Sequence, residues 1–319
     1  MPEGLEPPSG RQFELVHGSA VAVVTEVGGG IRTFEVDGDP VLFGYEADAL
    51  CSGGRGQVLA PWPNRLADGS YRWLGVEGAA AWDEPERRNA IHGLVRWLRW
   101  RGEQHSRSAV TMSTRIEPQP GYPWRVELAV RYELGTGTGS QTEDGGGAGS
   151  AALTLEVTAS NRSATAAPFG IGFHPYVFAG ELLADSCEME LAASTRLLTD
   201  ERGLPVGTTD VRGTEYDFSS PRRVGTTRLD DCLTGLAGPW RARVTRADGR
   251  FVTVAAGAEF PFAMVFTADT LAGDDRRRGI AIEPMTCPPN ALVSGEGLIV
   301  LEAAGATTWR GRVEIATGR

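Results

Sequence analysis

The chain has 319 residues, a formal net charge of −10 at pH 7 and an isoelectric point of about 5.1. Such an acidic chain lacks the basic surface that nucleic-acid binding needs, so we expect no nucleic-acid partner. All 31 basic residues are arginine. The absence of lysine excludes Schiff-base chemistry and the lysine of a phosphate-binding loop.

The cysteines are far apart and form no C-x-x-C pair; they are Cys51, Cys187, Cys232 and Cys287. Since H-E-x-x-H spacing is absent too, we predict no metal site and no disulfide framework, which favours a reducing compartment. Residues 1–8 are acidic and proline-rich, unlike a secretory signal peptide. Apolar stretches such as residues 260–268 are too short to span a bilayer, so we expect a cytoplasmic protein with no membrane partner.

Short apolar or alternating segments, separated by Gly, Pro or Asp, predict β-strands along nearly the whole chain. In chain order we expect strands at residues 20–27, 31–36, 41–45, 71–74, 111–116, 124–130, 155–159, 189–192, 251–255, 264–268, 280–283, 298–302 and 312–315. The stretch Val36-Asp37-Gly38-Asp39-Pro40-Val41 is a hairpin signal. Because neither a long amphipathic helix nor a strand–helix alternation is visible, we predict an all-β fold, a large antiparallel β-sandwich with few short helices.

One segment stands apart from this pattern. Residues 135–150 (GTGTGSQTEDGGGAGS) are of low complexity and contain no large apolar side chain. They would suit a linker between domains, but the segments on both sides read as consecutive strands. We therefore predict a flexible surface loop between hairpin partners within a single domain of residues 1–319.

The first polar constellation is residues 61–71 (PWPNRLADGSY), which are rich in aromatics, prolines and polar groups. Arg65 offers a planar fork of donors that suits sugar hydroxyls or an oxyanion. The structural alternative is a rigid turn in which Arg65 pairs with a local carboxylate such as Asp68.

Two of the four histidines lie in unusual settings. His92 stands between Ile91 and Gly93, where a satisfied core histidine is the alternative to a functional one. His174 precedes Pro175, which restrains it toward extended backbone. The aromatic residues around it offer a flat apolar surface for stacking on a sugar ring; they are Phe169, Phe173 and Tyr176.

Carboxylates supply the other candidates. Asp230 and Asp231 are adjacent, so at most one faces a given site if they lie on a strand, and a solvated turn is the alternative. Glu283 ends an apolar run, where a carboxylate is costly unless it is paired or functional. Glu302 follows another apolar run and competes with Glu283 on the same argument.

In order and spacing these motifs resemble the aldose 1-epimerase (galactose mutarotase-like) family. The stretches that carry the resemblance are Asn64-Arg65 with Gly69 and Tyr71, Asn89-Ala90-Ile91-His92-Gly93, Gly172-Phe173-His174-Pro175-Tyr176, Asp230-Asp231-Cys232-Leu233, and Glu283 with Pro289-Asn290. The resemblance covers about residues 13 to 316 and implies a large, mostly antiparallel β-supersandwich in one domain. It also implies an isomerase that needs no cofactor and takes a small-molecule sugar.

The resemblance implies a role for each matching residue. Glu283 falls where the family has its general base, which takes the proton from the C1 hydroxyl. His174 falls where the family has its general acid, which protonates the ring oxygen. His92 falls on a second active-site histidine that hydrogen-bonds near the ring oxygen. The residues assigned to substrate binding are Arg65, Asp230, Asn64 and Tyr176, and spacing alone does not separate Asp230 from Asp231.

Ordinary pKa values of ~4.3 for a carboxylate and ~6.5 for an imidazole would start this pair as base and acid near neutral pH. One departure from the family is His92-Gly93-Leu94, where the best-known galactose mutarotases have two glycines after the histidine; another is the missing Asn-Leu after the His174 motif. Both leave the choice of sugar open.

Three alternatives to an epimerase of free aldohexoses stay open. A hexose-6-phosphate mutarotase would need arginines near C6, for which Arg96, Arg72 and Arg87 are available. A non-catalytic carbohydrate-binding β-sandwich would keep the aromatics without turnover. A glycosidase would need Asp230 and Glu283 to flank one bond.

Overall fold

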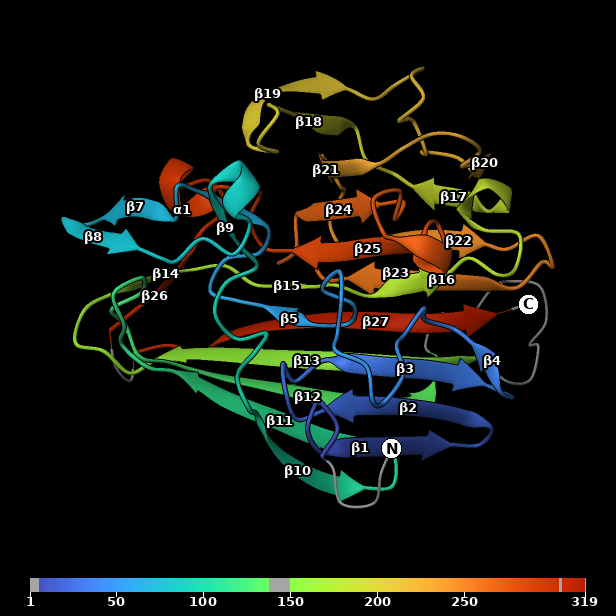
Figure 1. Ribbon diagram of the computed structural model, residues 1–319, viewed down its shortest axis with the longest axis horizontal. Coiled ribbons are helices and arrows are strands. Elements are labelled where there is room, and N and C mark those ends of the chain that lie inside the picture. Colours follow the sequence, from blue (N-terminus) through green and yellow to red (C-terminus); the bar gives the residue numbers. More distant parts are fainter. Residues whose placement is uncertain (1–5, 138–149, 304–305, 319) are drawn as a thin grey trace.

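The computed structural model describes residues 6–137, 150–303 and 306–318, and these consist mostly of β-strands and their connections (Figure 1). The largest sheet has nine antiparallel strands. In spatial order they are β10 (Arg101–Ser106), β11 (Ala109–Ile116), β12 (Val126–Thr136), β13 (Ala151–Asn161), β27 (Trp309–Gly318), β23 (Phe251–Ala256), β22 (Trp240–Thr245), β17 (Glu188–Leu191) and β20 (Arg222–Arg223).

A second large sheet of eight antiparallel strands carries the candidate catalytic residues. Its order is β19 (Pro205–Asp210), β18 (Thr195–Thr199), β21 (Asp230–Thr234), β24 (Phe262–Phe266), β25 (Gly279–Met285), β15 (Gly172–Phe173) and β5 (Val58–Leu59), with β16 (Tyr176–Phe178) also paired to β25. Figure 1 shows β25 near the middle of the molecule, and all seven of its residues are buried.

Smaller sheets complete the fold. The four-stranded sheet is β1 (Gln12–His17), β2 (Ala20–Thr25), β3 (Ile31–Val36) and β4 (Asp39–Pro40). Two-stranded ladders join β14 (Ala167–Phe169) to β26 (Ile299–Leu301), β6 (Arg65–Ala67) to β9 (Asn89–Ile91), and β7 (Ser70–Trp73) to β8 (Val76–Ala79). The helical elements of the described residues are α1 (Ala291–Ser294) and the 3₁₀ turns Pro85–Arg87, Ala184–Ser186 and Gly273–Asp275. None of these has the length or apolar character to cross a membrane.

Alternation of side chains sets the register of the sheets. Along β13, Leu155 and Val157 are buried while Glu156 between them is exposed. A slip of one residue would turn this whole apolar set toward solvent, so burial fixes the pairing. The inward side chains of several sheets join one apolar cluster that runs in sequence from Phe13 to Ile315. The prediction of an all-β, antiparallel sandwich is confirmed.

Most expected strands are present with shifted ends, but the expected strand at residues 41–45 is wrong. Only Leu42 pairs there, in an isolated bridge with Val177. The carbonyl groups that would continue a ladder are occupied by arginine side chains: Arg55 donates to Gly44 O and Arg32 donates to Tyr45 O. The residues beyond Leu42 are therefore held as a loop.

Two expected hairpins are confirmed. Val36 pairs with Asp39 across a two-residue turn, and both turn residues have left-handed backbone, with φ of 53° at Asp37 and 75° at Gly38. Farther along, β12 and β13 pair directly over eleven residues each, so they are hairpin partners rather than parts of two domains joined by a linker. The expected flexibility of residues 135–150 concerns a stretch of which residues 138–149 lie outside the described residues.

We predict that replacing residues 138–149 by Asn-Gly leaves the thermal midpoint within about 2 °C of the wild type. The physical reason is that the pairing of β12 with β13 already extends to the residues beside the replaced segment, because Gly137 N–H donates to Ser150 O at 2.9 Å. Differential scanning calorimetry of both proteins is the measurement. A fall of more than about 5 °C would show that the segment stabilises the folded state.

Candidate active site

Glu283 lies in the interior of the eight-stranded sheet. It is on β25, opposite Met264 of β24, and only 2% of its surface is exposed. One carboxylate oxygen, Oε1, lies 3.3 Å from Nε2 of His174. The other, Oε2, has no hydrogen-bond partner among the described residues. A buried carboxylate that keeps one oxygen unpaired is costly for folding, which makes Glu283 a candidate functional residue.

His174 is carried to Glu283 by the same strand. The short strands on either side of it both pair with β25, through Gly172 opposite Met285 and Tyr176 opposite Ala281. His174 thus occupies the break between two ladders of one strand. Its side chain is 4% exposed, and Nδ1 has no hydrogen-bond partner among the described residues.

Residues 51–57 form a backbone cradle around His174. The backbone N–H of His174 donates to Gln57 O, and its C=O accepts from Gly56 N–H. Gly54 has a φ of +71°, and a Cβ there would lie 2.8 Å from Cδ2 of the imidazole. Glycine at this position lets the loop approach the ring edge.

Tyr176 supports the other side of the imidazole. Its ring stacks on that of His174 with centroids 5.0 Å apart and planes 1° apart, and its hydroxyl donates to Gly53 O at 2.8 Å. Tyr176 is 1% exposed, so this side chain packs against the histidine. Phe169 and Phe173 are buried in the main apolar cluster.

His92 enters from the β6–β9 ladder. Its left-handed backbone (φ 64°) and that of Asn64 (φ 59°) bring the two residues together, so that each backbone N–H bonds to the other residue. His92 N–H donates to Asn64 O, and Asn64 N–H donates to Nδ1 of His92 at 3.2 Å. Because Nδ1 accepts, the proton of the neutral ring is on Nε2. The rings of His92 and His174 are 5.3 Å apart, edge to face.

Arg65 begins β6 and is buried. Its Nε lies 3.0 Å from Oε2 of Glu84, and its Nη2 donates to Oε1 of Glu84 at 3.2 Å. The expectation that Arg65 could pair with Asp68 is wrong, because Asp68 binds Arg88 and Arg202 instead. The backbone of Arg65 is also held, because the backbone N–H of Asn290 donates to Arg65 O.

The sheet register separates Asp230 from Asp231. Both lie on β21, so their side chains point to opposite faces, and the alternative of a solvated turn is wrong. Asp230 shares the face of Glu283, since Cys232, two residues on, pairs with Met264, which pairs with Glu283. Half of the Asp230 side chain is exposed, and its Oδ2 lies 3.8 Å from Nη2 of Arg65.

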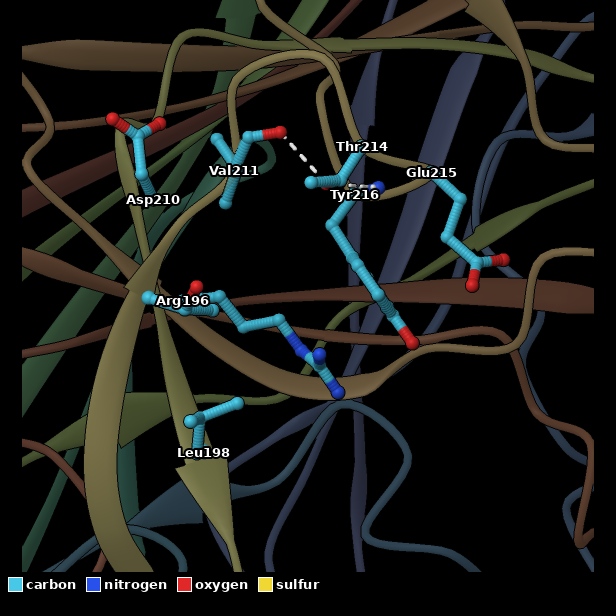
Figure 2. A pocket seen from close by; sticks show the side chains of 8 residues that line it. Arg196, Leu198, Asp210, Val211, Thr214, Glu215 and Tyr216 are labelled. Carbon is cyan, nitrogen blue, oxygen red and sulfur yellow. Dashed lines mark hydrogen bonds between the residues drawn. The ribbon is translucent and has the colours of Figure 1, made fainter.

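Asp231 points away and binds Arg196 at 2.6 Å. Arg196 covers the ring of Tyr216, with Cζ 3.7 Å from the ring centroid, at the wall of a separate pocket of about 390 Å³ (Figure 2). That pocket holds neither Glu283 nor either site histidine. Asp230 is therefore the aspartate of the candidate site.

Burial moves the pKa values of Glu283 and His174 in opposite directions. It raises the pKa of Glu283 well above 4.5; the Asp230 charge adds to this and Arg65 opposes it. It lowers the pKa of His174 to about 3, with the charge of Arg96 acting the same way. The ordinary values expected above therefore do not hold, because desolvation disfavours each charged form. Desolvation thus favours the protonated carboxyl of Glu283 and the neutral imidazole of His174.

The pKa of His92 also lies well below 6.5, first because of burial and then because of the charges on His174, Arg96 and Arg65. A neutral His92 with its proton on Nε2 is a hydrogen-bond donor toward the site, where Nε2 has no partner among the described residues. Glu302, the competitor of Glu283, follows β26 and is exposed. Within the described part of the chain, no cluster of three or more His, Cys, Asp or Glu residues is suited to a metal ion.

Sequence reasoning missed Glu84 and the cradle of residues 51–57. Glu84 belongs to Asp83-Glu84-Pro85, where nothing local indicates a long-range partner. The cradle carries a weak signal in Ser52-Gly53-Gly54-Arg55-Gly56, since clustered glycines are typical of close backbone approach. The structure brings together His92, His174, Glu283, Arg65, Asp230 and Asn64 with the supporting ring of Tyr176.

Comparison with known proteins identifies the family of the chain. The family model of aldose 1-epimerases matches residues 11–314, so the chain belongs to the aldose 1-epimerase family. Two proteins of Escherichia coli strain K12 are similar in sequence. YihR is 28% identical over 295 residues, which cover 92% of this chain and 90% of that protein, and YphB is 26% identical over 315 residues, 93% and 96%. Both are described as uncharacterized proteins.

Solved structures share the fold. The GalM/aldose epimerase homologue of Caenorhabditis elegans superimposes with a TM-score of 0.80 at 14% identity, covering 97% of this chain and 99% of that one. The galactose 1-epimerase of Lactobacillus acidophilus gives a TM-score of 0.77 at 17% identity, covering 96% and 93%. At these identities the likeness supports the architecture alone.

The raised pKa of Glu283 predicts how stability depends on pH. Above about pH 4.5 the unfolded chain releases this proton while the folded chain keeps it, so the cost of burying Glu283 grows as pH rises through this window. Glu283→Gln removes that cost. We expect its thermal midpoint to exceed that of the wild type by roughly 2 °C or more at pH 8 and by less at pH 4.5.

Calorimetry at the two pH values is the measurement, and Glu302→Gln, an exposed change of the same charge, is the control. A midpoint difference that does not grow with pH would contradict the raised pKa.

Proposed function

We propose that this protein interconverts the α and β anomers of a free aldohexose by general acid–base ring opening and closure. The observation that carries the proposal is the buried Glu283–His174 pair, 3.3 Å apart, with Oε2 of Glu283 unpaired among the described residues. Proton removal at one oxygen and donation at another is what anomerisation requires. Family membership supports the reaction class.

In the proposed cycle, Glu283 takes the proton of the C1 hydroxyl while His174 gives a proton to the ring oxygen. The C1–O5 bond breaks, and the C1 oxygen becomes the aldehyde oxygen. Rotation about C1–C2 presents the other face of the aldehyde, and the reverse transfers close the ring as the other anomer. His92 donates from Nε2 near the ring oxygen, which stabilises charge that develops there.

The proton count of the pair fits this cycle. In this proposal the pair shares one titratable proton, and moving it across the 3.3 Å gap from Oε1 to Nε2 gives the carboxylate and imidazolium that the first step uses. After ring opening the roles are exchanged, and after closure the count is restored. No oxidant, reductant or net proton change is needed.

The charges around the site favour an uncharged sugar over a hexose 6-phosphate. The candidate arginines already have carboxylate partners: Arg96 pairs with Asp83, Arg87 with Glu84, and Arg72 with Glu77. A phosphate would have to compete with these ion pairs. We accordingly propose a free aldohexose as the partner of this protein, in the cytoplasm.

We predict that Glu283→Gln lowers the rate of anomerisation by at least about 100-fold, since it removes one proton-transfer partner and keeps the shape. Polarimetry or proton NMR of freshly dissolved α-D-galactose and α-D-glucose measures the rate. The control is Glu302→Gln, for which we expect the wild-type rate. Loss of activity in Glu302→Gln with full activity in Glu283→Gln would reverse the assignment of the base.

His174→Asn should reduce kcat by a similar factor and leave KM nearly unchanged, because the histidine acts on the reacting atoms. Near-wild-type turnover would remove His174 as the acid. Wild-type protein that accelerates neither sugar would contradict the proposal for these substrates; the same assay on D-glucose 6-phosphate would then test the phosphorylated alternative. Sugar binding without turnover would indicate the non-catalytic sandwich.

The cradle around His174 makes a separate prediction. Gly54→Ala should lower kcat by about 10- to 100-fold, because the new Cβ displaces the imidazole. Gly213→Ala is the matched control: its φ is also +71°, but nothing lies within 4 Å of the added Cβ. Equal losses in both variants would mean that backbone strain, and not displacement of His174, is the cause.

A further inference from the structure

Arg65 forms an ion pair with Glu84, a carboxylate that no sequence motif indicated. Its Nε and Nη2 face the two oxygens of Glu84 at 3.0 and 3.2 Å, which is the paired geometry of a guanidinium on a carboxylate. The side chains are 10% and 14% exposed, so water competes little with this ion pair. This ion pair fixes the plane of the Arg65 guanidinium.

Glu84 is in turn held by a second layer. Asn89 Nδ2 donates to Oε2 of Glu84 at 2.9 Å. The same amide binds Arg202, donating to its carbonyl oxygen at 2.9 Å and accepting from its Nη2 at 3.2 Å. Burial opposes ionisation of Glu84, but the hydrogen bonds from Arg65 and Asn89 outweigh it and hold the pKa of Glu84 below 4.5.

The loop between β18 and β19, residues 200–204, covers the Nη1 end of the Arg65 guanidinium. Gly203 lies against the guanidinium, where a Cβ would be 2.6 Å from Nη1. Arg202 fastens this loop to the turn before β9, because its Nε donates to Arg87 O and its Nη2 donates to Arg88 O. Glu84 thus occupies the Nε edge of the Arg65 guanidinium, and Gly203 covers its Nη1 end.

The remaining direction points to the candidate sugar site. Nη2 of Arg65 is 3.8 Å from Oδ2 of Asp230, which is too long for a hydrogen bond. A hydroxyl group between the two can accept from Arg65 and donate to Asp230. Since Asp230 is half exposed, the gap is open to a ligand.

We propose that Glu84 is a positioning residue that holds the Arg65 guanidinium toward a sugar hydroxyl bridging Arg65 and Asp230. The inference rests on the proposed function, because it assumes a sugar in this site. Glu84 acts on binding rather than on proton transfer, since Glu283 and His174 are supported by other elements.

The test is steady-state anomerisation of D-galactose and D-glucose by Glu84→Gln. KM should rise about 10-fold, the loss expected for one charge-assisted hydrogen bond, while kcat stays within about 2-fold. Glu86→Gln is the control: Glu86 lies in the 3₁₀ turn that directly follows Glu84 and is exposed, so its substitution should leave both constants unchanged. An unchanged KM, or a kcat that falls as much as KM rises, would overturn the positioning role.

A double-mutant cycle with Arg65→Met separates positioning from a merely structural effect. If Glu84 acts through Arg65, adding Glu84→Gln to Arg65→Met leaves KM where Arg65→Met alone puts it. Multiplicative effects on KM would show that Glu84 does not act through Arg65.

Failure of the proposed function is recognised separately, from the wild-type assay and calorimetric binding of the same sugars. A wild type that binds sugar without turning it over overturns the epimerase proposal alone, and the Kd values of the four proteins in the cycle then decide the role of Glu84. A wild type that neither binds nor turns over either sugar overturns both.

Discussion

The structure depends on the burial of one carboxylate beside one imidazole. Inside the eight-stranded sheet, little water is present to stabilise a charge on Glu283 or His174. Desolvation therefore favours the neutral form of each side chain. A carboxyl and an imidazole 3.3 Å apart in a buried site are a costly feature for a fold and a useful one for proton relay.

One strand sets most of this geometry. β25 carries Glu283 itself, pairs through Ala281 and Met285 with the segments that flank His174, and pairs with β24 on its other side. Strand spacing in a sheet is nearly constant, so these pairings set the separation of Glu283 and His174. The loop of residues 51–57 then holds the backbone of His174. The next strand along, β21, then brings Asp230 to the same face.

The sequence pattern predicted those features that depend on residues close together in the chain. Alternation at residues 155–159 and the apolar run before Glu283 follow from burial, and both strands are present. Asp230 and Asp231 were inseparable by spacing, because only pairing with β24 shows which one shares the face of Glu283. Glu84 could not be predicted, since its partners depend on ladders that no local pattern encodes. That the chain is one domain stays a prediction.

The two halves of the site are supported by different means. His174 is held by backbone, through glycines and the anchored ring of Tyr176. Arg65 is held by side chains, through Glu84 and the layer behind it. Among the described residues no hydrogen bond joins these two supports directly. Under the proposed function, substitutions around Arg65 would change which hydroxyl pattern is bound while Glu283 and His174 stay in place, which would separate the choice of sugar from the chemistry performed on it.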